Sequence, residues 1–179
     1  MILKHTQYIN NNTSTNNMAT NNNPNSTEPN STFSLDDITF LVVDDDRANR
    51  RLFQEFLPEH GAKRVITFSD GGDLDSYFNG KKEDLKAGEE YTPEKKYVLI
   101  TDTDMPGKRG PEIGMEVREK YPEIKIAAMS GRKESQMEWI DVKPDIYFNK
   151  ADSLSELDAR LDDIISFLKF QHDYTVKKN

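Results

Sequence analysis

The residues that could carry chemistry stand at the ends of short apolar runs. Four of these runs are followed by polar or charged side chains: Asp44, Asp45 and Asp46; Asp102 and Asp104; Ser130; and Lys150. If the runs are parallel strands, their carboxyl ends share one edge of a sheet, which is where open α/β folds bind ligands. We therefore expect one pocket that contains carboxylates, a hydroxyl and an ammonium group.

Such a pocket favours a divalent metal. Carboxylates that converge repel one another and raise one another's pKa unless a cation lies among them. The chain has no cysteine and only three scattered histidines, at positions 5, 60 and 172, so the ligands offered are oxygens. Oxygen ligands favour Mg²⁺ (or Mn²⁺), which a phosphoryl oxygen often completes.

The same set of side chains suits the transfer of a phosphoryl group. An ammonium and a hydroxyl can stabilise the group in transfer, and a carboxylate can accept it. A single Asp at such a position is more often a helix N-cap. The set as a whole favours the pocket.

Five short apolar runs predict the strands of a parallel sheet. They cover residues 38–43, 65–68, 97–101, 124–129 and 146–148, and helical stretches separate them. Most of the runs lack alternation, as expected for strands that helices cover on both faces. The fold class is therefore α/β, a five-stranded doubly wound parallel sheet.

Spacing and capping signals place the helices. The first helix should end near Leu57, ahead of Pro58. Another begins at Gly110-Pro111, a short one covers residues 134–140, and the last follows a predicted capping box at Ser153. Residues 80–96 include ten charged residues among seventeen, which indicates a solvated loop.

The chain divides into three predicted parts. Residues 1–35 form a tail rich in Asn, Thr and Ser that should be disordered, because it offers little apolar surface to bury. Residues 36–172 form the folded domain, and residues 173–179 form a C-terminal tail.

Composition excludes several classes of function. The net charge of −8 disfavours direct binding to nucleic acid, which needs clustered Lys and Arg. The apolar runs are far shorter than a membrane span, so we expect no membrane partner. No secretory signal is visible, which predicts a cytoplasmic protein.

Residues 37 to about 170 resemble a response-regulator receiver domain of two-component signalling, of the stand-alone type. The resemblance rests on four motifs: LVVDDD at 41–46, DTDMPG at 102–107, MSG at 129–131 and YFNK at 147–150. It implies a flavodoxin-like (βα)5 fold with strand order 2-1-3-4-5.

The resemblance also implies roles for the pocket residues. Asp102 would accept a phosphoryl group from a phosphohistidine. Asp45 and Asp102 would bind Mg²⁺ directly, Asp44 would act mainly through water, and the backbone carbonyl of Asp104 would complete the protein ligands. Lys150 would pair with Asp102 at rest and with the phosphoryl group afterwards.

Further implied roles concern the response to phosphorylation. Ser130 would move toward the phosphoryl oxygens, and Tyr147 would follow as the second switch residue. Asp104 and Arg132 would tune hydrolysis of the acyl phosphate. The phosphodonor would be a histidine kinase or a histidine phosphotransfer protein, and the output would be contact with an unknown downstream protein target.

Some residues depart from the family pattern. Ala151 follows Lys150 where proline is usual, which predicts a trans bond at 150–151. Lys108 and Arg109 should add positive charge beside the acceptor. Trp139 either lies near the switching face or simply packs a short helix.

Two alternatives have different chemistry. A haloacid-dehalogenase-like phosphatase also has an Asp-x-Asp motif after a strand, but its last acidic pair follows the Lys, whereas Asp44 and Asp45 precede Asp102 here. A phosphorylation-independent binding module would keep the fold without the chemistry. Catalytic turnover of small phosphoesters would favour the phosphatase. A wild type that a small phosphodonor does not label would favour the binding module.

Overall fold

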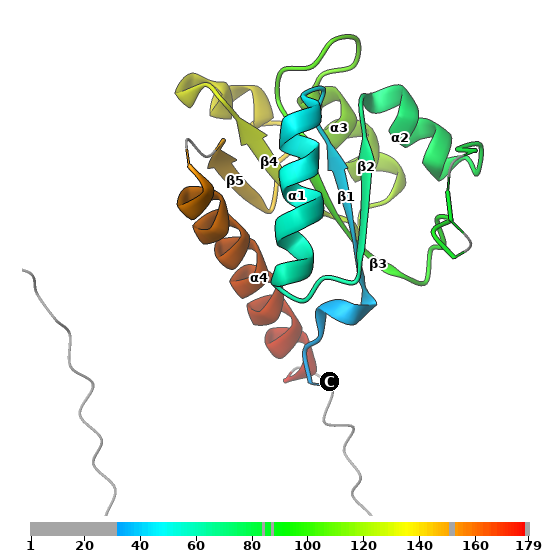
Figure 1. Ribbon diagram of the computed structural model, residues 1–179, viewed down its shortest axis with the longest axis vertical. Coiled ribbons are helices and arrows are strands. Elements are labelled where there is room, and N and C mark those ends of the chain that lie inside the picture. Colours follow the sequence, from blue (N-terminus) through cyan, green and yellow to red (C-terminus); the bar gives the residue numbers. More distant parts are fainter. Residues whose placement is uncertain (1–31, 84, 87, 151–152, 178–179) are drawn as a thin grey trace, which may run out of the picture. The chain divides into compact units, whose positions relative to one another are not determined.

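A five-stranded parallel sheet forms the centre of the computed structural model, which describes residues 32–83, 85–86, 88–150 and 153–177. The strands lie in the order β2-β1-β3-β4-β5 (Figure 1), which confirms the predicted fold and strand order. The predicted disorder of residues 1–31 lies outside the described residues.

Each predicted strand is present, with bounds shifted by one residue or less. The strands are β1 (Ile38–Val43), β2 (Arg64–Phe68), β3 (Lys96–Asp102), β4 (Lys125–Ser130) and β5 (Ile146–Asn149). Strands β3 and β4 end at Asp102 and Ser130 themselves. Asp102 pairs with Met129 and Ser130 pairs with Asn149, so the sheet ladder fixes the backbone of both polar residues.

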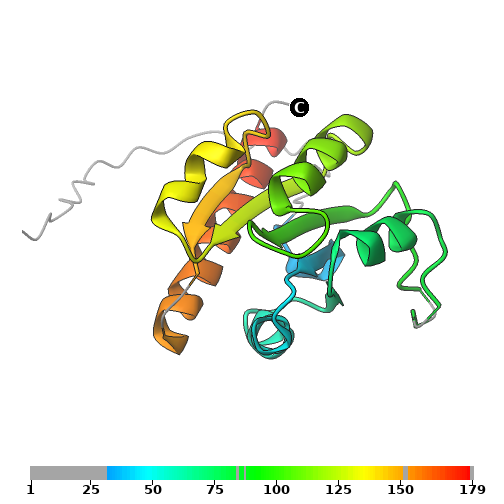
Figure 2. The same ribbon diagram turned by 90° about the horizontal axis from the view of Figure 1, so that it is seen from above.

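Helices cover both faces of the sheet. Helices α1 (Arg47–Glu59) and α4 (Leu154–Val176) pack on one face. The other face is covered by α2 (Gly71–Phe78), α3 (Gly110–Lys120) and the 3-10 helix η2 (Lys133–Trp139). Figure 2 shows α1 and α3 on opposite sides of the sheet. A further 3-10 helix, η1 (Leu35–Asp37), leads into β1.

The end predicted for the first helix is wrong by about two residues. Helix α1 continues to Glu59 and contains Pro58. Proline lacks an N–H group, but in the last turn this removes only one helical hydrogen bond. The backbone N–H of His60 still reaches the carbonyls of Phe56 and Leu57 at 3.3 and 3.2 Å, which closes the helix.

Helix η2 packs its only tryptophan into the core. Trp139 is 1% exposed, and its ring lies against Gly110 and Gly114, where a Cβ atom would come within 2.8 and 2.9 Å of it. The two glycines lie one helical turn apart and so open a groove on α3. Of the two interpretations of Trp139, packing is the observed one. Two apolar side chains here are exposed, Met137 of η2 and Ile140, the residue after it.

The charged stretch at 80–96 is not wholly a solvated loop. Tyr91 packs against the core, with its ring centroid 5.1 Å from that of Phe78 and 5.2 Å from that of Tyr121. Tyr97 also accepts a hydrogen bond of 2.9 Å from the backbone of Thr92. Charge dominates the composition of this loop, but one aromatic side chain anchors it.

The ends of the described chain also contribute to the core. Phe33 and Leu35, within the predicted tail of residues 1–35, pack against the cluster beneath α1 and α4. Helix α4 continues to Val176, four residues beyond the predicted domain end at 172. Among the described helices, none is long and apolar enough to cross a membrane.

The contact between α3 and β3 makes a stability prediction. Substituting Gly110→Ala would place a Cβ atom 2.0 Å from the backbone oxygen of Asp102, so the helix must move away from the strand. We expect a loss of about 1–3 kcal/mol in the free energy of unfolding, as for other overpacked sites. Urea unfolding at neutral pH measures the loss.

The matched control is Gly131→Ala, because nothing lies within 4 Å of the added carbon. It should change the free energy of unfolding by less than about 0.5 kcal/mol. Equal stabilities for the two variants would contradict the close approach of α3 to β3.

Candidate functional site

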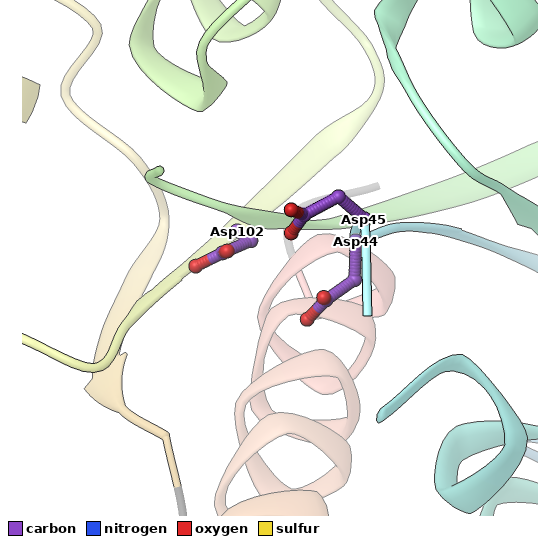
Figure 3. Close-up of side chains that lie close together, drawn as sticks. All are labelled: Asp44, Asp45 and Asp102. Atoms are coloured by element: carbon purple, nitrogen blue, oxygen red, sulfur yellow. The ribbon is translucent and has the colours of Figure 1, made fainter. Parts of the chain in front are cut away.

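Three carboxylates meet at the carboxyl edge of the sheet. Asp44 and Asp45 follow β1 and Asp102 ends β3, and Figure 3 shows their side chains close together. Each offers one oxygen, and these oxygens all lie within 4.8 Å of one another. Asp44 and Asp102 are buried whereas Asp45 is exposed, so the cluster has a solvent-facing side.

Lys150 lies between two of these carboxylates. Its Nζ atom is 2.8 Å from Oδ2 of Asp102 and 3.0 Å from Oδ2 of Asp44. Burial acts to lower the pKa of Lys150, but the hydrogen bond to Asp102 and the charge of Asp44 outweigh it and leave the pKa raised. The ammonium therefore stays charged. The predicted trans bond at 150–151 lies outside the described residues.

At Asp102, in contrast to Lys150, burial outweighs the ion pair between the two residues. Burial raises its pKa, the Lys150 ammonium opposes that rise, and the negative charge of Asp44 adds to it, so the pKa lies above the usual range. Its other oxygen, Oδ1, accepts a 2.8 Å hydrogen bond from the backbone N–H of Thr103. One ammonium thus contacts two buried carboxylates, and its single positive charge can neutralise only one of them.

This charge balance fits a divalent cation. Three carboxylates and one ammonium leave a net charge of −2 when all are ionised, and the three carboxylate oxygens that approach one another are hard ligands. The close spacing on an exposed side is what a cation with several bound waters requires. The residues present therefore fit Mg²⁺ or Mn²⁺.

The loop after β1 is held by contacts that sequence analysis missed. Arg50 donates to the backbone carbonyls of Asp44 and Asp45 at 2.6 and 2.9 Å. The backbone N–H of Asp46 donates to Oδ1 of Asp44 at 2.8 Å, and Asp46 itself caps α1. Arg50 lies one turn into α1, and three residues separate it from the acidic triplet. This spacing lets a long basic side chain reach back to the triplet, and it could have identified Arg50 from the sequence.

Ser130 is fully buried at the end of β4. Its Oγ atom accepts a 3.0 Å hydrogen bond from the backbone N–H of Arg132. Its carbonyl accepts a 2.7 Å bond from the backbone N–H of Lys150. The end of β4 and the residue after β5 are therefore joined directly, which places the hydroxyl and the ammonium on the same side of the sheet edge.

Asp104 belongs to a separate cluster of charges above this edge. Arg132 donates to both of its oxygens, at 2.7 and 2.8 Å, and Arg109 donates to one at 2.8 Å. Glu138 of η2 accepts from both arginines, at 2.7 Å from Arg132. The Arg132 hydrogen bond lowers the pKa of Asp104, and although burial opposes it, Arg109 lowers it further.

Lys108, which the sequence predicts to add charge beside the acceptor, forms ion pairs with two helices. Its Nζ atom lies 2.8 Å from Asp75 of α2 and 2.7 Å from Glu116 of α3. Two carboxylates therefore hold Lys108 against the helices. Arg109 does lie near the acceptor loop, but Asp104 and Glu138 neutralise it.

The remaining predicted residue, Tyr147, lies beside η2 and is half-buried. Its hydroxyl is 2.8 Å from Oγ of Ser135, a buried residue that sequence analysis missed. Thr103 was also missed: its hydroxyl accepts a 2.9 Å bond from Trp139 and donates a 2.7 Å bond to the carbonyl of Met129. No pattern in the sequence distinguishes Ser135 from other polar residues of a short helix.

An apolar cavity of about 250 Å³ adjoins Lys150 between α1 and α4. Its lining includes Leu52 and Phe53 from α1 and Leu154 and Leu157 from α4. Leu154 is 55% exposed. An apolar surface thus borders the charged pocket on one side.

Comparison with known proteins agrees with this geometry. The family model for the response regulator receiver domain matches residues 40–162. The structure is similar to response regulator TrrA of Thermotoga maritima in complex with Mg²⁺ and BeF, with 26% identity, a TM-score of 0.54 and coverage of 70% of this chain and 96% of that one. A search among curated proteins found no match.

Two other similar structures are less identical in sequence and support the fold. The phosphorylated cyanobacterial phytochrome response regulator RcpA has 23% identity and a TM-score of 0.57, covering 73% of this chain and 92% of that one. The Mn²⁺-bound response regulator Rcp1 has 20% identity and a TM-score of 0.56, covering 72% and 92%.

The fold and the acidic cluster define an α/β signalling domain of the two-component class. The chain belongs to the response regulator receiver family. Receiver domains are in general signalling switches rather than catalysts, and they interact with histidine kinases or phosphotransfer proteins. Phosphorylation and Mg²⁺ are typical of the family.

The raised pKa of Asp102 makes a prediction about stability and pH. Because folding disfavours its charged form, Asp102→Asn should increase the free energy of unfolding at pH 7. The gain should be absent below the usual carboxyl pKa, about 3.9, and complete above the raised value. Urea unfolding of both proteins between pH 4 and 7.5 measures it.

Asp104→Asn is the control of opposite sign. The pKa of Asp104 is lowered, so its charge contributes stability above the usual carboxyl pKa, and this contribution is lost as pH falls. The Asn variant should be less stable than the wild type at pH 7. A loss of stability in Asp102→Asn at that pH would show that the Lys150 ion pair outweighs burial.

Proposed function

We propose that this protein is a phospho-accepting switch in which Asp102 takes a phosphoryl group from a phosphohistidine donor. The observation that carries the proposal is the position of Asp102, 2.8 Å from the Lys150 ammonium and within 4.8 Å of the oxygens of Asp44 and Asp45. A carboxylate held in this way is both a nucleophile and part of a cation site.

The transfer is a substitution at phosphorus. An oxygen of Asp102 forms the new P–O bond while the P–N bond to the donor imidazole breaks, and the released imidazole takes a proton from solvent. Lys150 already contacts the attacking carboxylate, so it can follow the negative charge as it moves onto the phosphoryl oxygens. Ser130 can donate its hydroxyl proton to one of those oxygens.

Asp45 and Asp102 would hold Mg²⁺ (or Mn²⁺) directly, with Asp44 acting through water and the Asp104 carbonyl as a further ligand. The cation would neutralise charge that develops on the phosphoryl oxygens. The burial of Asp44 and its contact with Lys150 favour this indirect role.

The remaining site residues would act after transfer. Ser130 and Tyr147 form the proposed switch, and Asp104 and Arg132 the pair that tunes hydrolysis. In the resting structure both oxygens of Asp104 are bound by Arg132, so this pair acts as a unit rather than as two free side chains. Loss of either partner should change the lifetime of the acyl phosphate.

The proposed setting is cytoplasmic, with a histidine kinase or a histidine phosphotransfer protein as donor. The output would be a contact with a protein target, without direct binding to nucleic acid or membrane. The net charge of −8 supports the exclusion of a phosphate backbone.

Labelling by a small phosphodonor tests the proposal. With phosphoramidate and Mg²⁺, intact-mass measurement should show at most one phosphoryl group per chain, and chelation of the metal or Asp102→Asn should abolish it. Lys150→Ala should slow labelling by about 100-fold or more, the usual effect of removing a charge-stabilising group. Asp141→Asn, an exposed substitution outside the site, should label like the wild type.

The same assay separates the alternatives. Release of many phosphate molecules per chain from small phosphoesters would support a phosphatase instead. An unlabelled wild type would support a phosphorylation-independent binding module.

The apolar cavity beside Lys150 supports an approach route for the donor protein. A phosphohistidine that reaches Asp102 must bring its carrier surface close to the loop after β5, where α1 and α4 expose Leu52 and Leu154. We therefore expect the donor to bury apolar side chains in this cavity.

Leu154→Glu should weaken transfer from a phosphohistidine protein without affecting the chemistry. We expect about a tenfold slower transfer from the protein donor, typical of a charge placed in an apolar contact, and an unchanged rate from phosphoramidate. Met115→Glu, on a similarly exposed residue of α3, is the matched control. Equal slowing by both variants, or slowing with phosphoramidate, would contradict this route.

A further inference from the structure

A chain of hydrogen bonds connects Ser130 with Tyr147 through the backbone of Arg132. The backbone N–H of Arg132 donates to Oγ of Ser130 at 3.0 Å, and the Arg132 carbonyl accepts the Ser135 hydroxyl at 2.7 Å. Oγ of Ser135 is in turn 2.8 Å from the Tyr147 hydroxyl. Every step lies within normal hydrogen-bond distance.

The direction of these bonds follows from Ser135. The Arg132 carbonyl can only accept, and Ser135 lies closer to it than Tyr147 does, at 2.7 Å against 3.4 Å. When Ser135 donates its single proton to this carbonyl, the Tyr147 hydroxyl is the donor to Ser135. Ser135 is fully buried, and water therefore cannot replace either partner at low cost. The Tyr147 hydroxyl also lies 3.4 Å from the Arg132 carbonyl, so both hydroxyls converge on this carbonyl.

We propose that Ser135 is the positioning residue that couples the hydroxyl of Ser130 to the ring of Tyr147. This inference rests on the proposed function, because it needs Ser130 to turn toward a phosphoryl group on Asp102. Ser135 touches neither Asp102 nor the phosphoryl group. It acts by fixing the carbonyl of Arg132 in the 132–133 peptide group, which restrains the adjoining 131–132 peptide group, whose N–H holds Ser130 in its present position.

The hydrogen bonds through Arg132 favour the resting arrangement over the phosphorylated one. The chain of bonds is complete in the present structure, in which Ser130 accepts the Arg132 N–H. When Ser130 turns away, that N–H loses its acceptor and the 131–132 peptide group is free to rotate. The rotation shifts the adjoining carbonyl of Arg132, which Ser135 and Tyr147 contact. The chain of bonds therefore stabilises the resting arrangement, and weakening it favours the phosphorylated one.

Affinity for beryllofluoride, a phosphoryl analogue, measures this bias in the presence of Mg²⁺. Trp139 provides the signal because it is the chain's single tryptophan and contacts Thr103, the residue after Asp102. Ser135→Ala should increase the affinity by about two- to tenfold, the range that one net hydrogen bond is worth. Tyr147→Phe should increase it by a similar factor.

The double variant is the decisive measurement. If Ser135 and Tyr147 act through one chain of bonds, Ser135→Ala combined with Tyr147→Phe should gain no more than either single variant. In addition, the ring NMR signals of Tyr147 should shift on beryllofluoride binding in the wild type and stay in place in Ser135→Ala. A merely structural serine would affect unfolding but neither of these readouts.

Tyr121→Phe is the matched control, because its ring packs on Phe78 and Tyr91 rather than on η2. It should leave the beryllofluoride affinity unchanged. Multiplicative gains in the double variant, or an unchanged or lower affinity in Ser135→Ala, would overturn the inference. A wild type that binds no beryllofluoride would instead overturn the proposed function, so the two failures are distinguishable.

Discussion

The site depends on one ammonium group shared between two buried carboxylates. Lys150 reaches both Asp44 and Asp102, and it cannot neutralise both. Burial and the negative charge of Asp44 together raise the pKa of Asp102 against the opposing effect of Lys150. With all three carboxylates ionised, the pocket keeps an excess of negative charge, which fits a divalent cation.

Backbone contacts hold these charged side chains in place. Asp102 and Ser130 are the last residues of paired strands, and the backbone of Lys150 bonds to the carbonyl of Ser130. On the outer side, Gly110 lets α3 approach the carbonyl of Asp102 so closely that no side chain fits between them. Such tight packing resists a shift of α3 against β3, so we expect a change at Asp102 to move the loops rather than the strand.

Two sets of contacts lead from the acceptor to η2, and they differ in chemistry. One is an exposed cluster of charges that includes Asp104, Arg132 and Glu138, and salt will screen it. The other is less exposed: the bond from Trp139 to Thr103 is buried, and the bond between Ser135 and Tyr147 is partly buried. Salt screens these contacts less than it screens the exposed charges.

Periodicity and strand-end residues were enough to predict the parallel sheet and the convergence of Asp44, Asp45 and Asp102, while the family was inferred from the resemblance of four motifs. These features follow from local rules, since a parallel sheet brings the carboxyl ends of its strands to one edge. Contacts between distant side chains were not predictable in this way. The sequence shows that Lys108 and Arg109 are basic, but only the folded chain shows that α2 and α3 hold one and Asp104 the other. Ser135 gave no signal at all, because its role depends on which hydroxyl and which carbonyl the packing of η2 brings within reach.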